Sequence, residues 1–302
     1  MKSRAIILML FAVHMFGMDG GRTTVQGPVA GYVFDQQVRG VRPMLGLPGA
    51  AYLGDALVGG LEAAGIAPDG ARALVVREGR LFLVSLKGEA GPAPVENAIA
   101  GADRFAWSPD GSVAAVYASA SRKAQIIRNG AAGEPVVLSG PGEVAALAVT
   151  RSGKLIAGVA GENGGVYMDG ALLARAANPA AITVAGQDLY FVDKERGQVW
   201  QVAGFETDGA ALLFAEGMDG AAGVQVYGSR VFVAGAKGIE VFDLTARALL
   251  GHLDVDAAPT GLTPFGERAL WLLNAPGEGQ PAYVLSAAEV PAVYFVPAGR
   301  EE

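Results

Sequence analysis

The chain has 302 residues, of which 51% are hydrophobic and 18% are charged, and its formal net charge is −7. This length allows a large core in one or two domains, and this composition excludes a disordered chain. No cluster of Lys and Arg is present, so nucleic acid is not an expected partner. The absence of cysteine excludes disulfides, thiolate metal sites and a cysteine nucleophile.

The amino terminus has the pattern of a secretory signal. Lys2 and Arg4 precede an apolar run over residues 5–16, and small residues follow from Gly17. A basic start before about a dozen apolar residues is typical of such a signal, whereas a membrane-spanning helix needs about 20. We therefore expect a signal peptide over residues 1–20 and a secreted or periplasmic protein. No Ala-x-Ala cleavage triplet is present, so an uncleaved membrane anchor is the alternative.

After the signal, residues 31–35 and 38–45 are candidates for two strands joined by a polar turn. They resemble a later pair, residues 238–243 and 246–253, because the first segment of each pair begins with Gly and ends in Phe-Asp. We therefore expect the amino-terminal segment to form the outer half of one structural repeat.

Six fuller repeats follow, and each is marked by a glycine between two apolar segments. These glycines recur at intervals of about 40 residues, at Gly70, Gly111, Gly153, Gly186, Gly228 and Gly266. Glycine suits a tight hairpin turn because it adopts positive φ without a Cβ clash. The apolar run after each glycine, such as residues 72–76 or 189–192, predicts a second strand. A third strand and a more polar fourth strand follow it.

Four short strands in a repeat of about 40 residues are typical of a β-propeller. The second strands are apolar on both faces, as expected for strands between neighbouring sheets. We predict an all-β fold with a single β-propeller domain of four-stranded antiparallel blades over residues 23–298, followed by a tail over residues 299–302. Seven blades are favoured, with the two terminal segments completing one blade between them. Six blades with an extra hairpin are the alternative.

One turn carries a longer motif. Phe105-Ala-Trp-Ser-Pro-Asp-Gly111 closely resembles the repeat signature of TolB-type, WD-like propellers, and Ile66-Ala-Pro-Asp-Gly70 matches it in part. The Trp-Asp end of true WD repeats is missing from every unit. The resemblance implies a propeller that is often extracytoplasmic and often a binding platform. It transfers no functional site, because these motif residues build turns.

Side chains suited to catalysis or metal binding are sparse. His252 is the only histidine after the signal, so it has no partners for a multi-histidine metal site. After the signal, five aspartates precede glycine in separate places, and this spacing indicates turn residues rather than calcium ligands; they are Asp69, Asp110, Asp169, Asp208 and Asp219. Three tryptophans fall at non-equivalent places in the repeats, which indicates burial between blades rather than a quinone cofactor; they are Trp107, Trp200 and Trp271.

We therefore assign no catalytic, cofactor-binding or metal-binding residue, and no cofactor. The favoured hypothesis is a secreted or envelope β-propeller that acts as a non-catalytic binding scaffold for an unknown protein or extracellular ligand. We expect a monomer without a membrane span in the mature chain. The alternative is a metal-dependent, lactonase-like hydrolase with its site in the central channel, because a propeller channel can collect one ligand from each blade.

Overall fold

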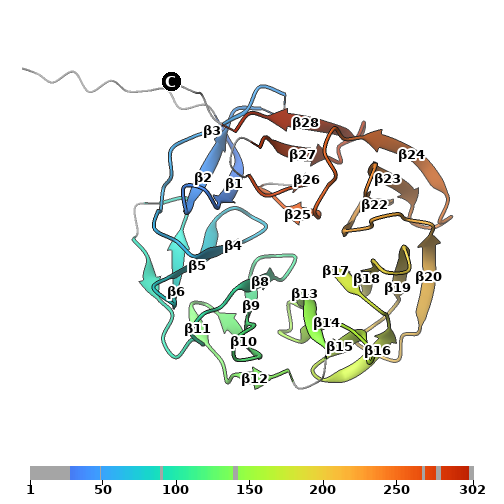
Figure 1. Cartoon of the computed structure of the whole chain (residues 1–302), viewed down its shortest axis with the longest axis horizontal. Helices are drawn as coiled ribbons and strands as arrows, with labels where there is room; N and C mark the ends of the chain where they lie inside the picture. Colours follow the sequence, from blue (N-terminus) through green and yellow to red (C-terminus); the bar gives the residue numbers. More distant parts are fainter. Residues whose placement is uncertain are drawn as a thin grey trace, which may run out of the picture.

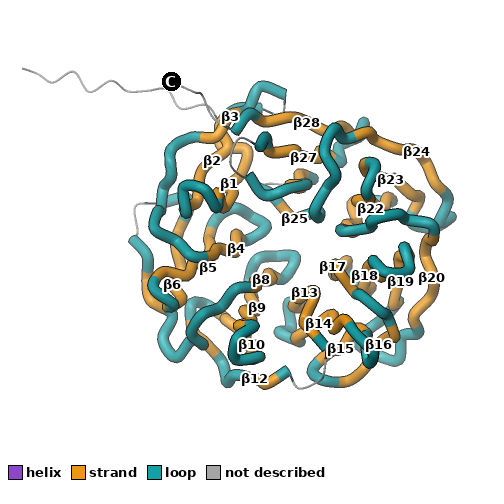
Figure 2. Tube along the Cα trace, in the orientation of Figure 1, coloured by secondary structure: helices purple, strands orange, loops and turns teal. Residues whose placement is uncertain are grey.

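A computed structural model describes residues 28–47, 49–88, 91–138, 142–266, 269–276 and 280–298. Within these residues the strands form seven antiparallel sheets arranged around a ring (Figure 1). Strands and loops, without a helix, make up this part of the chain (Figure 2), so it contains no helix that could span a membrane. The predicted seven-bladed β-propeller is confirmed. The predicted signal peptide and tail lie outside the described residues.

The first strand of each blade lies nearest the centre of the ring, and the second packs outside it. The first strands are β1 (Val29–Asp35), β4 (Ala63–Ile66), β8 (Arg104–Trp107), β13 (Glu143–Val149), β17 (Pro179–Ala185), β21 (Gly223–Tyr227) and β25 (Thr263–Pro264). The second strands are β2 (Gly40–Leu45), β5 (Arg72–Arg77), β9 (Val113–Ala118), β14 (Leu155–Ala160), β18 (Asp188–Asp193), β22 (Arg230–Gly235) and β26 (Leu270–Leu272). Most residues of the second strands are buried, because neighbouring blades cover both of their faces.

The outer strands complete the blades. The third strands are β3 (Tyr52–Leu53), β6 (Arg80–Ser85), β10 (Lys123–Arg128), β15 (Gly165–Met168), β19 (Gln198–Val202), β23 (Gly238–Asp243) and β27 (Ala282–Ser286). The fourth strands are β7 (Ala93–Pro94), the divided pair β11 (Ala131–Ala132) and β12 (Val136–Val137), then β16 (Ala171–Arg175), β20 (Ala211–Glu216), β24 (Leu249–Asp254) and β28 (Ala292–Val296). Several fourth strands expose apolar side chains, so the expectation of a polar outer strand is wrong for β20, β24 and β28; they include Leu212, Leu213, Leu249, Leu250 and Phe295.

The turn glycines behave as predicted. All six lie between the first and second strands of a blade, with φ between 59° and 86°. At these angles a Cβ would clash with the backbone, which explains why the sequence places glycine there repeatedly. The amino-terminal blade has Arg39 at a positive φ of 49° before β2 instead. Because this turn lacks the repeated glycine, the sequence pattern does not identify the amino-terminal blade as a full repeat.

The prediction for the two chain ends is wrong in two respects. Strand β1 is an inner strand, so residues 31–35 belong to the inner half of a blade rather than the outer half. In addition, β1, β2 and β3 form a three-stranded sheet of their own, while β25 to β28 form a separate four-stranded sheet. The likeness to residues 238–243 arises from a shared turn: the carboxylates of Asp35 and Asp243 each accept hydrogen bonds from backbone N–H groups two and three residues ahead.

The ring therefore closes by side-chain packing between two separate sheets. Val33 and Met44 of the first blade are in one buried cluster with Phe265, Val284 and Val296 of the last blade. Burial of apolar area is the main favourable term in folding, so this cluster takes the place of shared strand hydrogen bonds at the closure.

Candidate functional site

The inner strands of all seven blades surround a central channel of about 860 Å³. Its lining is mainly apolar and includes aromatic side chains from three blades, namely Phe34, Phe105, Trp107, Phe265 and Trp271. Aliphatic side chains such as Ile66 and Ile182 continue this surface. The volume lies within the range of about 300–1,000 Å³ that is usual for small-molecule sites. The channel is therefore the main candidate site.

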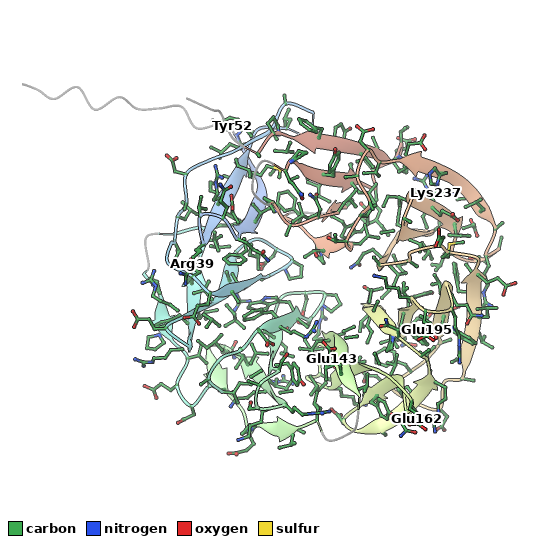
Figure 3. The ribbon with its side chains drawn as sticks, in the orientation of Figure 1. Arg39, Tyr52, Glu143, Glu162, Glu195 and Lys237 are labelled. Atoms are coloured by element: carbon green, nitrogen blue, oxygen red, sulfur yellow. The ribbon has the colours of Figure 1, made fainter. Side chains whose placement is uncertain are left out.

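Ionisable acidic and basic side chains are missing from this lining. Among the described residues that line the channel there is no Asp, Glu, His, Lys or Arg. Of the labelled charged residues, Arg39, Glu162, Glu195 and Lys237 lie over the ring of blades (Figure 3). Glu143, at the start of the inner strand β13, lies nearer the central opening but does not line the channel (Figure 3). Across the described ranges, no three His, Asp or Glu side chains are grouped as a metal site would require. The sequence-based hydrolase alternative thus has no set of metal ligands in the described channel.

Several polar side chains of the lining form hydrogen bonds that join one blade to the next. Thr183 Oγ1 donates to Gln225 Oε1 at 3.0 Å, and Gln225 Nε2 donates to the carbonyl of Leu262 at 3.0 Å. These two bonds connect the inner strands β17 and β21 to the segment before β25. On the other side of the channel, Trp107 Nε1 donates to the carbonyl of Gly65 at 3.0 Å. These three side chains are therefore already hydrogen-bonded within the protein, and the channel offers mainly apolar contact to a ligand.

Glycine allows the inner strands to approach closely at one of these junctions. A Cβ on Gly65 would lie 2.3 Å from Cβ of Phe105, in the next blade. The same pair of strands carries the bond between Trp107 and Gly65. Gly65 therefore fixes the position of two aromatic side chains in the channel wall.

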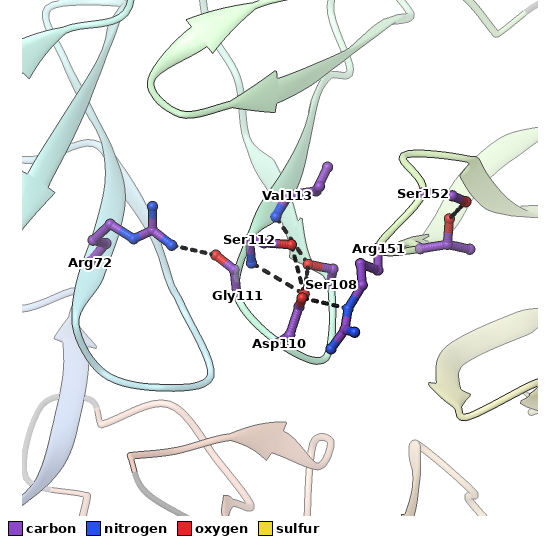
Figure 4. A network of polar contacts seen from close by, with 9 residues as sticks. Arg72, Ser108, Asp110, Gly111, Ser112, Val113, Arg151 and Ser152 are labelled. Atoms are coloured by element: carbon purple, nitrogen blue, oxygen red, sulfur yellow. Dashed lines mark hydrogen bonds and ion pairs between the residues drawn. The ribbon is translucent and has the colours of Figure 1, made fainter.

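A second polar arrangement, which we call the rim network, lies at one mouth of the channel (Figure 4). It consists of Arg72, Ser108, Asp110, Ser112 and Arg151, and the adjoining Pro109 lines the channel itself. The hydroxyls of Ser108 and Ser112 donate to Asp110 Oδ1 at 2.7 and 2.8 Å. Arg151 Nε, in the fourth blade, lies 2.6 Å from Asp110 Oδ2. The Pro-Asp-Gly turn thus also connects neighbouring blades.

The rim network changes the acidity of its carboxylate. Burial raises the pKa of the Asp110 carboxyl, but hydrogen bonds from Ser108 and Ser112 and the nearby charge of Arg151 lower it, and the net result is a pKa of about 2, below the ordinary value of 3.8. Arg72 connects the second blade to the same turn, because its guanidinium donates to the carbonyl of Gly111 at 2.7 Å. These contacts give Asp110 a structural role in the turn.

The structure also places the other residues considered from the sequence. Asp69 accepts a hydrogen bond from the N–H of Ala71, two residues ahead, at 2.9 Å, as expected for a turn residue. Asp169 instead accepts from the N–H of Leu155, on the neighbouring strand β14, at 3.0 Å. His252 lies on the outer strand β24, with Nε2 3.5 Å from Oδ1 of the exposed Asp254. Trp200 and Trp271 pack between blades, as predicted. Trp107 and Trp271 also line the channel, which the sequence did not indicate.

Sequence reasoning named the central channel only as the site of the alternative hydrolase and identified none of its lining residues. Its signal was present in the strands that precede the turn glycines, because most of these strands, including residues 63–66, 145–149 and 181–185, contain no charged residue. By local pattern alone, such segments do not differ from ordinary buried strands. These strands line one common channel only because the seven blades are arranged in a ring.

No protein-family model and no curated protein matches this chain. Solved structures do resemble it: virginiamycin B lyase from Staphylococcus aureus gives a TM-score of 0.55 at 14% sequence identity, over 80% of this chain and 85% of that chain. A catalytically inactive variant of that lyase with quinupristin gives 0.57 at 13% identity, over the same shares. A functionally unknown protein from Desulfotomaculum acetoxidans gives 0.57 at 13% identity, over 88% of this chain and 98% of that chain. At these identities the likeness shows the fold alone.

Proposed function

We propose that this protein is a non-catalytic binding propeller whose central channel takes an apolar ligand. The observation that carries the proposal is the channel of about 860 Å³, lined by aromatic and aliphatic side chains from the inner strands. Its described lining contains no Asp, Glu, His, Lys or Arg, and several of its polar side chains already bond to a neighbouring blade. An apolar ligand would remove this surface from water, which is favourable by about 25 cal/mol per Å².

The likeness to a lyase does not alter this proposal. The lyase structure with quinupristin is a histidine-to-alanine variant that is catalytically inactive. Within the described part of this chain the one histidine is His252, on the outer strand β24 rather than in the channel. A histidine there cannot reach a ligand in the channel, which supports binding without turnover.

We also propose that the protein acts outside the cytoplasm, as a monomer. The basic and apolar pattern of residues 1–16 supports export, and so does the resemblance of residues 105–111 to TolB-type repeats. Strand β1 begins at Val29, so cleavage near residue 20 would remove none of the described strands. Cell fractionation with amino-terminal sequencing tests this: we expect an envelope or secreted form that begins between residues 18 and 28, and a cytoplasmic form that retains Met1 would contradict it.

The binding proposal is tested by native mass spectrometry after incubation with an envelope extract. We expect the wild type to retain an apolar molecule whose mass is the same as its mass in the extract. Ala64→Phe places a larger side chain on the channel wall and should abolish this retention. Ala171→Phe, on the exposed outer strand β16, is the matched control and should retain the molecule. Chemical conversion of the retained molecule would contradict the proposal and indicate an enzyme. Hydrolysis of a lactone that depends on bound calcium or zinc would do the same.

A further inference from the structure

We propose that the space between the third and fourth blades is a second binding site, for an uncharged apolar small molecule. This space, which we call the interblade pocket, has a volume of about 430 Å³. Strands β10 and β12 line it on one side, and β14 and β15 line it on the other. It shares no lining residue with the central channel. The inference therefore goes beyond the proposed function of the channel.

The pocket exists because the facing side chains are small. Ala124 on β10 and Ala157 on β14 are both almost completely buried, and both line the space. The next interface along the ring, between the fourth and fifth blades, is filled instead by Phe191 and Phe205. Interiors of proteins are packed with few voids larger than a water molecule. A space of this size beside such small side chains therefore leaves room for a ligand between the two blades.

The outer wall of the pocket is an apolar surface in contact with solvent. Val136 and Val137 on β12 are 53% and 57% exposed, and Leu138 extends the same wall. Side chains of this kind gain from a partner that removes their surface from water. An apolar molecule between β12 and β14 would contact Val136 and Val137 on one side and Leu155 and Val159 on the other.

The wall is held in place by a buried glutamine. Gln125 is 1% exposed, and its Nε2 donates to the carbonyls of Gly133 and Asn97 at 2.6 and 3.0 Å. Its Oε1 accepts a hydrogen bond from the N–H of Ile99 at 2.8 Å. These bonds fix the loop between β11 and β12, where the outer strand is divided. The pocket is therefore formed before a ligand arrives, which lowers the cost of binding.

The polar groups of the lining favour an uncharged ligand. The Arg122 guanidinium donates to the carbonyl of Gly142 at 2.8 Å, and the Asp169 carboxylate accepts from the N–H of Leu155 at 3.0 Å. The hydroxyl of Tyr167 donates to the carbonyl of Asn163 at 2.7 Å. With Glu134, the lining contains charges of both signs, so it has no concentrated field for an ion. Selection then depends on shape and apolar contact.

The test uses N-phenyl-1-naphthylamine, an uncharged apolar fluorescent probe, with methyl-resolved NMR of the whole protein. We expect binding to shift the methyl signals of Val136, Val137 and Leu155. Ala157→Leu should fill the pocket and weaken this binding at least tenfold, and Ala124→Leu provides a second filling variant if the first does not fold. Ala171→Leu, on the exposed strand β16, is the matched control and should leave the affinity unchanged.

The methyl signals also separate this inference from the proposed function of the channel. Shifts confined to Ile66, Ile182 and other channel residues would support the channel and overturn the interblade site. Shifts at Val136 and Val137 that persist in both filled variants would also overturn it. An anionic analogue, 1-anilinonaphthalene-8-sulfonate, should bind to these residues at least tenfold more weakly, and equal affinity would contradict the assignment of an uncharged ligand.

Discussion

Gly31 and Phe265 lie against each other where the first and last blades meet. A Cβ on Gly31 would lie 2.7 Å from Cζ of the Phe265 ring, closer than side chains tolerate. Phe265 is 2% exposed and belongs to the cluster that closes the ring. The packing of Phe265 against the first blade thus depends on the absence of a side chain at Gly31.

Gly31→Val should therefore destabilise the ring closure. The added side chain would overpack a buried interface, which typically costs about 1–3 kcal/mol. Urea unfolding should show a lower midpoint than for Gly59→Val, since Gly59 is exposed and has no heavy atom within 4 Å of an added Cβ. The additional change Phe265→Leu should recover part of the loss. Equal stabilities of Gly31→Val and Gly59→Val would refute this account of the closure.

Truncation after Leu273 should prevent soluble folding. It removes β27 and β28, and with them Ala282, Val284 and Val296 of the closing cluster. The first blade would then expose Val33 and Met44, and the remaining sheet edge would favour aggregation. Size-exclusion chromatography and thermal melts provide the measurement. A monomeric truncated chain with a cooperative melt would show that the last blade is dispensable.

Gly111→Val should be destabilising because valine is strained at a positive φ, and not because its side chain would collide with a neighbouring residue. Gly111 has a φ of 68°, and an added Cβ would meet nothing closer than 3.5 Å. A β-branched residue at positive φ is strained, at a cost of about 1–3 kcal/mol. Gly251→Val, in strand β24 without positive φ, is the control and should be close to neutral. Matching melting temperatures for the two variants would contradict the strain argument.

The contribution of Asp110 to stability should depend on pH. Its folded-state pKa of about 2 lies below the ordinary 3.8, so ionised Asp110 stabilises the fold fully above pH 3.8. This stabilisation is lost as the pH falls toward 2. Asp110→Asn should therefore cost about 1 kcal/mol at pH 7, because the carboxylate is partly solvent-screened. The difference from wild type should shrink at pH 3, and a difference that is unchanged between pH 7 and pH 3 would contradict the role of the charge.

The hydrogen bonds in the rim network should matter more than its ion pair. Ser108 is completely buried and both donates to Asp110 and accepts the N–H of Val113 at 3.0 Å. Arg151 is 78% exposed at its side chain, where an ion pair contributes little. Ser108→Ala should therefore lower the melting temperature more than Arg151→Ala does. The reverse order would show that the connection between blades depends mainly on charge.

The sequence by itself determined the turns and the kind of fold. The six turn glycines and the Pro-Asp-Gly motif are local features, because positive φ and the hydrogen bonds of Asp110 involve residues within a few positions of one another. Apolar segments between these turns have the length of strands, and their regular recurrence requires blades that cover one another's faces. For this reason the β-propeller and its seven blades could be predicted.

Only the tertiary structure decided how the chain ends meet and which surfaces are free. The Phe-Asp turns at Asp35 and Asp243 are alike, yet one follows an inner strand and the other follows a third strand. Packing against the last blade fixes that difference, and it depends on residues more than 200 positions apart. The aromatic channel and the interblade pocket likewise arise where segments from different blades face each other, because strand register and neighbouring side-chain volume, rather than local pattern, set which groups line a space.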